Sequence, residues 1–287
     1  MEALTDIGYM KSVLQKHGFH FSKALGQNFL TNPTVCPRMA EACGLTKEWG
    51  ALEVGPGCGV LTRELAHLAD KVVALELDAR LLPVLEETLA EQDNVKVIHG
   101  DVLKTDLTTL LQEEFGDRPV AICANLPYYI TSPVIMYLLE SRVPAECITV
   151  MVQKEAAERL CAKPGTRECG AVTLAVQYYA EVEKLFSVSR GSFMPSPKVD
   201  SMVIRLKPKK ELPLEKEEEK RLFSLIKAAF GQRRKTLVNA LQVSGLQKEQ
   251  IKEILDKAGI SQTARAEQLS MEDFLKINIL AGTKSGL

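Results

Sequence analysis

The sequence lacks any segment suited to crossing a membrane. None of the uninterrupted apolar runs in its 287 residues approaches the roughly 20 residues that a membrane-spanning helix needs. The first ten residues carry Glu2 and Asp6, where an export signal would have a basic start. These absences argue against a membrane or secreted protein. We expect a soluble, cytoplasmic chain without a membrane partner.

The sequence also lacks a cysteine pattern typical of metal binding. Its seven cysteines are odd in number, contain no Cys-x-x-Cys pair and mostly lie within apolar runs. Structural zinc sites usually use closely spaced pairs of cysteine or histidine ligands. Reduced thiols in the core of a cytosolic protein are therefore the expected state, and we predict no metal site.

A strong net charge is missing too, but the charge is unevenly distributed. Residues 1–200 hold 19 Lys and Arg against 26 Asp and Glu, whereas residues 201–287 hold 17 against 11. A basic region can bind phosphate groups, since each neutralised phosphate releases counterions. A basic, solvated surface explains the same numbers, so charge alone leaves both interpretations open.

What the sequence does contain is a regular alternation of short apolar runs and helix-length amphipathic segments. Near-continuous apolar strands separated by helices indicate a parallel sheet covered on both faces. We predict strands at 51–54, 72–77, 95–99, 120–124 and 148–152, with helices at 60–69, 79–90, 107–115 and 133–140. This is a doubly wound, Rossmann-like α/β domain, which binds ligands at the carboxyl ends of its strands.

The later part of the chain has a different pattern of expected strands and helices. Two further strands, at 182–188 and 199–206, are joined by a turn-rich segment and would add one antiparallel strand to the mostly parallel sheet. Prolines and a Lys/Glu run then interrupt the pattern, and helices follow at 217–230, 235–242, 248–258 and 271–279. We predict a first domain over residues 1–207, with an N-terminal lid segment, and a small all-α domain over residues 208–287.

The first strand leads into a glycine-rich turn. Gly55, Gly57 and Gly59 alternate with other residues directly before a helix, which permits a sharp turn, close approach of a ligand and binding of an anionic group at the helix start. The spacing departs from the dinucleotide pattern G-x-G-x-x-G. A plain turn between strand and helix is the alternative.

Carboxylates follow the next two strands. Glu76 lies 21 residues beyond Gly55, about where a ribose-binding acid is expected, and Asp101 ends the third strand, where it can accept a hydrogen bond from an adenine amino group. Either acid alone can be a solvated strand end or a helix cap. Three successive strand ends with such residues favour a nucleoside-containing ligand.

The fourth strand ends in the tetrapeptide Asn125-Leu126-Pro127-Tyr128. An amide, a turn stiffened by proline and an aromatic face suit the edge and face of an amino-bearing base, whereas Asn and Pro are also common in ordinary turns. Both interpretations are open on this segment alone.

These motifs resemble known families. Residues 53–59 have the form E-x-G-x-G-x-G of the class I S-adenosylmethionine-dependent methyltransferases. Five segments then resemble the ribosomal RNA adenine dimethyltransferases, above all the small-subunit, kasugamycin-sensitivity group, with alanine at position 24 where serine is expected. The segments are KALGQNFL at 23–30, NLPY at 125–128, VQKE with ERL at 152–155 and 158–160, FMPSPKVDS at 193–201 and FGQRRKTL at 230–237.

The resemblance implies a function and a set of site residues. It implies S-adenosylmethionine as cofactor, S-adenosylhomocysteine as product, and dimethylation of two adjacent adenines in the 3′-terminal hairpin loop of 16S rRNA in the pre-30S particle. The implied cofactor-binding residues are Asn28, Leu30, Gly55, Gly57, Gly59, Glu76, Asp101 and Asn125. Phe29 would anchor the N-terminal segment in the core, and we expect a monomer.

The implied chemistry relies on positioning. Asn125 and a backbone carbonyl near Leu126 would accept the two N–H bonds of the adenine amine and direct its lone pair at the methyl group. Pro127 would fix the turn, and Tyr128 and Phe193 would sandwich a base that has left its stack. Arg233, Arg234 and Lys235 are candidates for binding RNA phosphates, or else a solvated helix start.

Two other functions fit parts of the sequence. A DNA adenine methyltransferase usually has the motif D/N-P-P-Y/F, and here Leu126 stands in place of its first proline. A non-catalytic RNA-binding assembly factor, or a transcription factor, would keep the fold without needing the cofactor and Asn125 motifs. Methyl transfer tested on immature small subunits, naked RNA and DNA separates these possibilities.

Overall fold

The computed structural model describes residues 4–22 and 26–282 and divides the chain into two compact units. The first consists of residues 1–157 and 182–208, and the second of residues 158–181 and 209–287. Lys23, Ala24 and Leu25, three positions of the N-terminal motif, lie outside the described residues.

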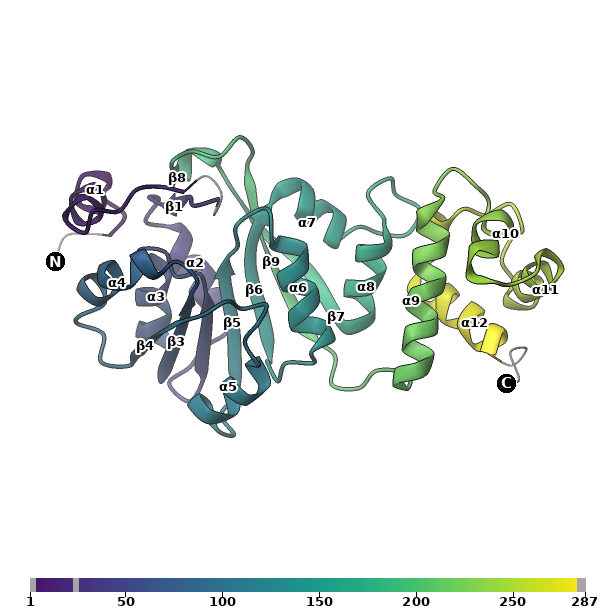
Figure 1. Cartoon of the computed structure of the whole chain (residues 1–287), viewed down its shortest axis with the longest axis horizontal. Helices are drawn as coiled ribbons and strands as arrows, with labels where there is room; N and C mark the ends of the chain where they lie inside the picture. The colour runs from purple at the N-terminus through teal and green to yellow at the C-terminus, as the bar shows by residue number, and fades with distance from the viewer. Residues whose placement is uncertain (1–3, 23–25, 283–287) are drawn as a thin grey trace. The chain divides into compact units, whose positions relative to one another are not determined.

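The first unit is built around a seven-stranded sheet in the order β4-β3-β2-β5-β6-β9-β7 (Figure 1). Strands β2 to β6 pair in parallel with their neighbours, whereas β9 runs antiparallel to β6. The predicted fold class, a mostly parallel doubly wound sheet with an antiparallel strand, is therefore confirmed. The strands are β2 Gly50–Val54, β3 Lys71–Glu76, β4 Val95–His99, β5 Val120–Asn125, β6 Cys147–Gln153, β7 Ala180–Val188 and β9 Ser201–Pro208.

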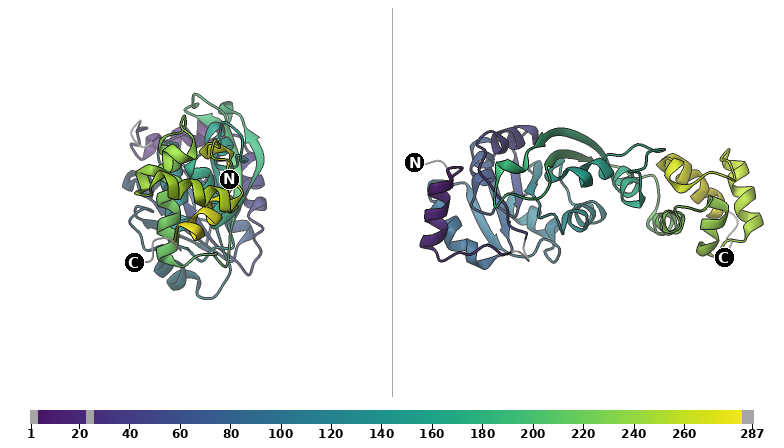
Figure 2. Two further views of the ribbon diagram at one scale, coloured as in Figure 1. Left: turned by 90° about the vertical axis from the view of Figure 1, so that its right-hand side faces the viewer. Right: turned by 90° about the horizontal axis from the view of Figure 1, so that it is seen from above.

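Burial explains why these runs are apolar along their whole length. Every residue of β2, and all but the last residue of β5 and of β6, is buried, because helices cover both faces of the sheet (Figure 2). The helices are α2 Val35–Ala42, α3 Val60–Leu68, α4 Leu82–Thr88, α5 Leu107–Phe115 and α6 Thr131–Glu140. The prediction of one helix over 79–90 is wrong in detail. A 3-10 turn, η1 Ala79–Leu81, precedes α4, and Pro83 stands in the first turn of α4, where its missing N–H does no harm.

The N-terminal segment adds elements that the sequence did not reveal. Helix α1, Ile7–Lys16, begins at Asp6, whose side chain accepts a hydrogen bond from the Tyr9 N–H. Its apolar face packs into a cluster with residues of α4. Further on, β1, Phe29–Leu30, pairs antiparallel with β8, Phe193–Met194. The beginning of the chain is thereby attached to a segment more than 160 residues later.

The second unit is helical in its C-terminal part (Figure 2). Its helices are α8 Ala171–Tyr179, α9 Lys216–Gly231, α10 Leu237–Ala240, α11 Lys248–Ala258 and α12 Met271–Gly282, and α7 Lys154–Leu160 enters it from the first unit. The expected boundary at 207/208 differs from this grouping, because residues 158–181 pack with the C-terminal helices. Tyr178 and Tyr179 show why, since their hydroxyls bind Glu219 of α9 and their rings contact Phe223.

The thiols are core residues, as predicted. Six of the seven cysteines are buried and Cys161 is half-buried, and none forms a disulfide in the described ranges. Within those same ranges, no three His, Cys, Asp or Glu side chains are grouped so that they could hold a metal ion. No helix over residues 4–22 and 26–282 is long and apolar enough to span a membrane.

Candidate active site

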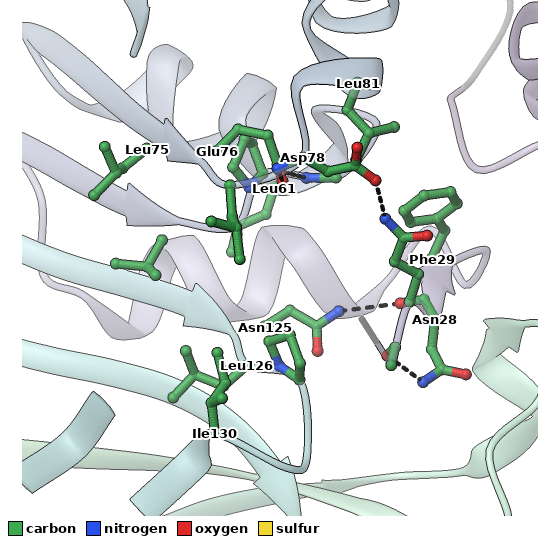
Figure 3. A pocket seen from close by; sticks show the side chains of 18 of the residues that line it. Asn28, Phe29, Leu61, Leu75, Glu76, Asp78, Leu81, Asn125, Leu126 and Ile130 are labelled. Atoms are coloured by element: carbon green, nitrogen blue, oxygen red, sulfur yellow. Dashed lines mark hydrogen bonds between the residues drawn. The ribbon is translucent and has the colours of Figure 1, made fainter. Parts of the chain in front are cut away.

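A pocket lies where the carboxyl ends of β2, β3 and β5 meet the segment after β4 (Figure 3). Parallel strands bring their carboxyl ends to one edge of the sheet, so residues far apart in the sequence become neighbours. The pocket lining includes nearly every residue predicted for cofactor binding or catalysis: Asn28, Leu30, Gly55, Gly57, Glu76, Asp101, Asn125, Leu126, Pro127, Tyr128 and Phe193.

The three glycines of the turn have different surroundings. All have positive φ angles, between 60° and 82°, which side chains rarely adopt. A Cβ on Gly55 would point into open space, whereas one on Gly57 would lie 3.2 Å from the Phe29 ring. Gly59 does not line the pocket; it caps α3, and a Cβ there would meet Leu89 at 2.9 Å. The structure thus places Gly55 and Gly57 at the pocket and gives Gly59 a packing role.

Glu76 joins the ends of β2 and β3. Glu76 is buried, with 6 % of its surface exposed. Its two carboxylate oxygens accept hydrogen bonds from the backbone N–H groups of Gly57, at 3.3 Å, and Asp78, at 2.8 Å. Burial raises the pKa of this carboxyl, while the two N–H donors act in the opposite direction. The acid is therefore a fixed part of the pocket wall and not a solvated strand end.

Asp101 is more open. One of its carboxylate oxygens accepts the Leu103 N–H at 3.0 Å, and the other lies 3.7 Å from the Lys104 amine. The side chain thus stabilises its own turn, as the simpler interpretation expects, while it also lines the pocket.

Asn125 faces Asn28 across the pocket (Figure 3). Its Nδ2 donates to the Asn28 carbonyl at 3.4 Å, and the Asn28 side chain in turn donates to the Gly26 carbonyl at 2.9 Å. Because the amide nitrogen of Asn125 is directed at Asn28, its oxygen is the end left to accept a hydrogen bond from a ligand.

The rest of the tetrapeptide is held by its neighbours. The Leu126 N–H donates to the Met151 carbonyl and so extends the hydrogen bonding between β5 and β6. The Pro127 carbonyl accepts a hydrogen bond from the Ile130 N–H, which closes the turn. The Tyr128 hydroxyl lies 2.9 Å from the Ser201 hydroxyl at the start of β9. Burial raises the pKa of Tyr128, so this phenol stays neutral at ordinary pH.

The VQKE and FMPSPKVDS motifs meet at the start of β9, where Tyr128 makes its contact to Ser201. Gln153 pairs with Ser201 in the register of β6 and β9, and the Lys154 N–H donates to the Asp200 carbonyl. Phe193 is buried and pairs with Leu30 in the β1 and β8 ribbon. Phe29, the expected anchor, is buried against Phe19 and Phe21, with ring centroids 5.9 Å and 5.3 Å away.

Sequence reasoning missed several lining residues. Gln27 and Asp78 are joined by a hydrogen bond of 2.8 Å, and Tyr129, which is 53 % exposed, covers Gly26, where a Cβ would lie 3.3 Å from its ring. The position of Asp78 two residues after Glu76 was a usable signal. Nothing in the sequence indicated that Gln27 would be its partner.

A second buried carboxyl lies in β2, two residues before Gly55. Glu53 is 1 % exposed, and its Oε2 has no hydrogen-bond partner in the part of the chain that the structure describes. Burial raises its pKa to about 8; the Thr62 hydroxyl opposes the shift and the Glu76 carboxylate adds to it. Glu53 is therefore largely protonated at neutral pH.

The predicted RNA-binding residues lie in the second unit, after α9. All three are exposed, but Arg233 also donates to the carbonyls of Arg167 and Cys169, at 2.8 Å and 3.0 Å. Arg233 thus supports a neighbouring turn, and Arg234 and Lys235 are the better candidates for contacting a partner.

Comparison with known proteins gives a consistent family. Residues 18–282 match the family model described as "Ribosomal RNA adenine dimethylase". Proteins named ribosomal RNA small subunit methyltransferase A are similar over nearly their whole length. The one from Geobacillus thermodenitrificans is 48 % identical over 94 % of both chains, and the one from Clostridioides difficile is 44 % identical over 99 % of both.

Solved structures agree with this result. A dimethyladenosine transferase from Plasmodium falciparum has a TM-score of 0.76 and 28 % identity, covering 90 % of this chain and 98 % of its own. The 23S rRNA methyltransferase ErmE has a TM-score of 0.69 and 29 % identity, covering 88 % and 99 %. These relatives decide against the DNA methyltransferase and the non-catalytic alternatives. The chain belongs to the ribosomal RNA adenine dimethylase family and is an rRNA adenine dimethyltransferase.

Proposed function

We propose that the chain uses S-adenosylmethionine to dimethylate the exocyclic amines of two adjacent adenines in the 3′-terminal hairpin loop of 16S rRNA. It acts in the cytoplasm, as a monomer, on the pre-30S particle, and S-adenosylhomocysteine is the second product. The observation that carries the proposal is the convergence of the glycine turn, Glu76, Asp101 and the Asn125–Tyr128 segment in one pocket of a chain from this family.

The pocket wall suits the cofactor. Gly55 leaves open space beside a backbone turn, and Glu76 is a buried acid at the end of the second strand, where ribose hydroxyls can donate to it. Asp101 would accept from the adenine amine of the cofactor, with Asn28, Leu30 and Gly57 around it. When bound, S-adenosylmethionine supplies an electrophilic methyl group.

The other half of the pocket would orient the substrate base. The lone pair of an adenine amine is delocalised into the ring, so the amine is a poor nucleophile. Asn125 Oδ1 and the Leu126 carbonyl would accept its two N–H bonds and direct the lone pair out of the ring plane. The methylated amine loses its proton readily to water, so the chain needs no strong base.

Aromatic and apolar groups would hold the base in that orientation. Tyr128 offers a ring face whose direction is set by the hydroxyl contact to Ser201, and Phe193 lines the same pocket from β8. A base can enter only after it has left its stack, and stacking on such rings offsets part of that cost. In the second unit, Arg234 and Lys235 would bind RNA phosphates.

The proposal is tested by mapping methyl groups. The purified chain is incubated with labelled S-adenosylmethionine and small subunits from cells that lack the modification, with 23S rRNA and DNA as controls. Dimethyladenosine at two adjacent positions near the 3′ end of 16S rRNA is the expected result. Labelling of 23S rRNA alone, or at a single unrelated adenine, would contradict the proposed substrate.

A further inference from the structure

Asp78 occupies the junction between the cofactor acid and the beginning of the chain. Its side chain is 7 % exposed, and its carboxylate accepts hydrogen bonds from two directions. Gln27 Nε2 reaches Oδ2 at 2.8 Å, and the Arg80 guanidinium binds both oxygens, with Nε at 2.8 Å from Oδ1 and Nη2 at 2.6 Å from Oδ2. A charge this well satisfied is rigidly oriented.

The backbone of the same residue holds Glu76. The Asp78 N–H donates to Glu76 Oε1 at 2.8 Å, which is the shorter of the two backbone bonds to that acid (Figure 3). A displacement of Asp78 would therefore remove a donor from Glu76 and leave a buried carboxylate less well satisfied.

Asp78 is also connected, directly through Gln27 and indirectly through Arg80, to what we call the N-terminal strap, residues 19–22 and 26–30. Gln27 donates to Asp78 and accepts the Ser22 N–H at 2.9 Å. Arg80 donates to the His20 carbonyl at 3.3 Å and lies over the Phe19 ring at 5.2 Å. The strap also carries Asn28, whose carbonyl accepts from Asn125.

We infer that Asp78 is a positioning residue that couples the strap to Glu76, so that the strap reaches its place beside the pocket only when Glu76 is oriented to bind the cofactor. The inference rests on the proposed function, because it treats Glu76 and Asn28 as cofactor contacts. Asp78 touches no reacting atom in this scheme. Its effect passes through the two groups that it aligns.

The coupling is tested by binding of S-adenosylhomocysteine, measured by calorimetry. We expect Asp78→Asn and Gln27→Ala each to weaken binding about tenfold, the usual effect of losing a hydrogen bond to a charged group. The double variant should lose little more than Asp78→Asn alone, since Gln27 acts through Asp78. In steady-state kinetics of the same variants, KM for the cofactor should rise, while kcat should change less than about threefold.

Glu87→Gln is the matched control. Glu87 binds Lys16 and His17 at 2.7 Å, so its loss also loosens the N-terminal segment, but away from the pocket. Binding within about twofold of the wild type is expected. The coupling would be overturned if Glu87→Gln weakened binding as much as the two test variants do. It would also be overturned if the fold-losses of the two single variants multiplied in the double variant. Failure of the wild type itself to bind would instead count against the proposed function.

Discussion

The pocket has two halves that are built differently. The cofactor half, made by the 55–57 turn, Glu76 and Asp101, is held mostly by hydrogen bonds between carboxylates and backbone N–H groups. The base half, made by Asn125–Tyr128 and Phe193, is held by contacts that cross the sequence. Asn125 reaches Asn28, 97 residues away, and Tyr128 reaches Ser201, 73 residues away.

The two halves of the pocket therefore depend on different features of the chain. Backbone donors at strand ends are supplied by the sheet itself, so the cofactor half depends mainly on the fold and on the contacts that hold Asp78. The base half needs particular side chains on distant segments. Changes in the cofactor half should mainly weaken binding, and changes in the base half should mainly slow turnover.

The strongest test of this contrast is Asn125→Ala. Removing the acceptor that orients the amine should lower kcat about 10³-fold, in the range found for loss of one well-placed polar group in a transition state. Binding of S-adenosylhomocysteine should weaken less than about tenfold, since only the contact to Asn28 is lost. Single-turnover methyl transfer and calorimetry measure the two effects, and equal losses in both would break the comparison.

Glu76→Gln should show the opposite pattern. The amide keeps the size of the side chain but loses the charge that ribose hydroxyls and two backbone N–H groups bind, so cofactor affinity should fall about 100-fold. At saturating cofactor, kcat should stay within about fivefold of the wild type. Unchanged affinity would remove Glu76 from the cofactor half.

Tyr128 allows a finer test within the base half. Tyr128→Phe keeps the ring and loses only the contact to Ser201, so turnover should fall about fivefold, in line with one neutral hydrogen bond. Tyr128→Ala removes the stacking face and should reduce turnover far more, with cofactor binding retained. If the two variants were equally active, the ring would not be a stacking surface.

The last test concerns Glu53, in the strand that leads into the cofactor half, and measures stability. Its pKa is raised to about 8 in the folded chain, so the folded state binds this proton more tightly than the unfolded state does. The stability is therefore fully present below the ordinary carboxyl pKa of 4.5 and falls as the pH rises from there to about 8, with a slope of up to about 1.4 kcal/mol per pH unit.

Glu53→Gln should remove that dependence. Thermal unfolding of the two proteins at pH 6 and pH 9 measures the change, and the variant should lose less stability than the wild type over this interval. Charged groups that act on Glu53 include Glu76 and the Cys43 thiol, so Cys43→Ala provides a control for thiol titration. An identical pH dependence in all three proteins would contradict the raised pKa.

The residues around the pocket differ in how far the sequence predicts them. Gly55, Glu76, Asp101 and Asn125 each follow a recognisable apolar strand, and a parallel sheet brings such positions together without further information. The pairing of Gln27 with Asp78, and of β1 with β8, depends on which surfaces pack, and no local pattern records that. The grouping of residues 158–181 with the C-terminal helices likewise depends on packing.

Gly59 shows a different limit of pattern reading. Its spacing fits a cofactor motif, yet its positive φ and the nearby Leu89 give it a reason to be glycine without any ligand. Motif spacing cannot distinguish a glycine that admits a ligand from one that admits a neighbouring side chain.

The pairing of β1 with β8 has a consequence for biosynthesis. Phe29 and Leu30 are made early, but their partners Met194 and Phe193 follow more than 160 residues later. The strands that lead to Gly55, Glu76 and Asn125 are synthesised well before β8, although a domain generally folds as a unit. The base half can be finished only when nearly the whole first unit has been synthesised, so all residues of the cofactor wall precede the last part of a working site.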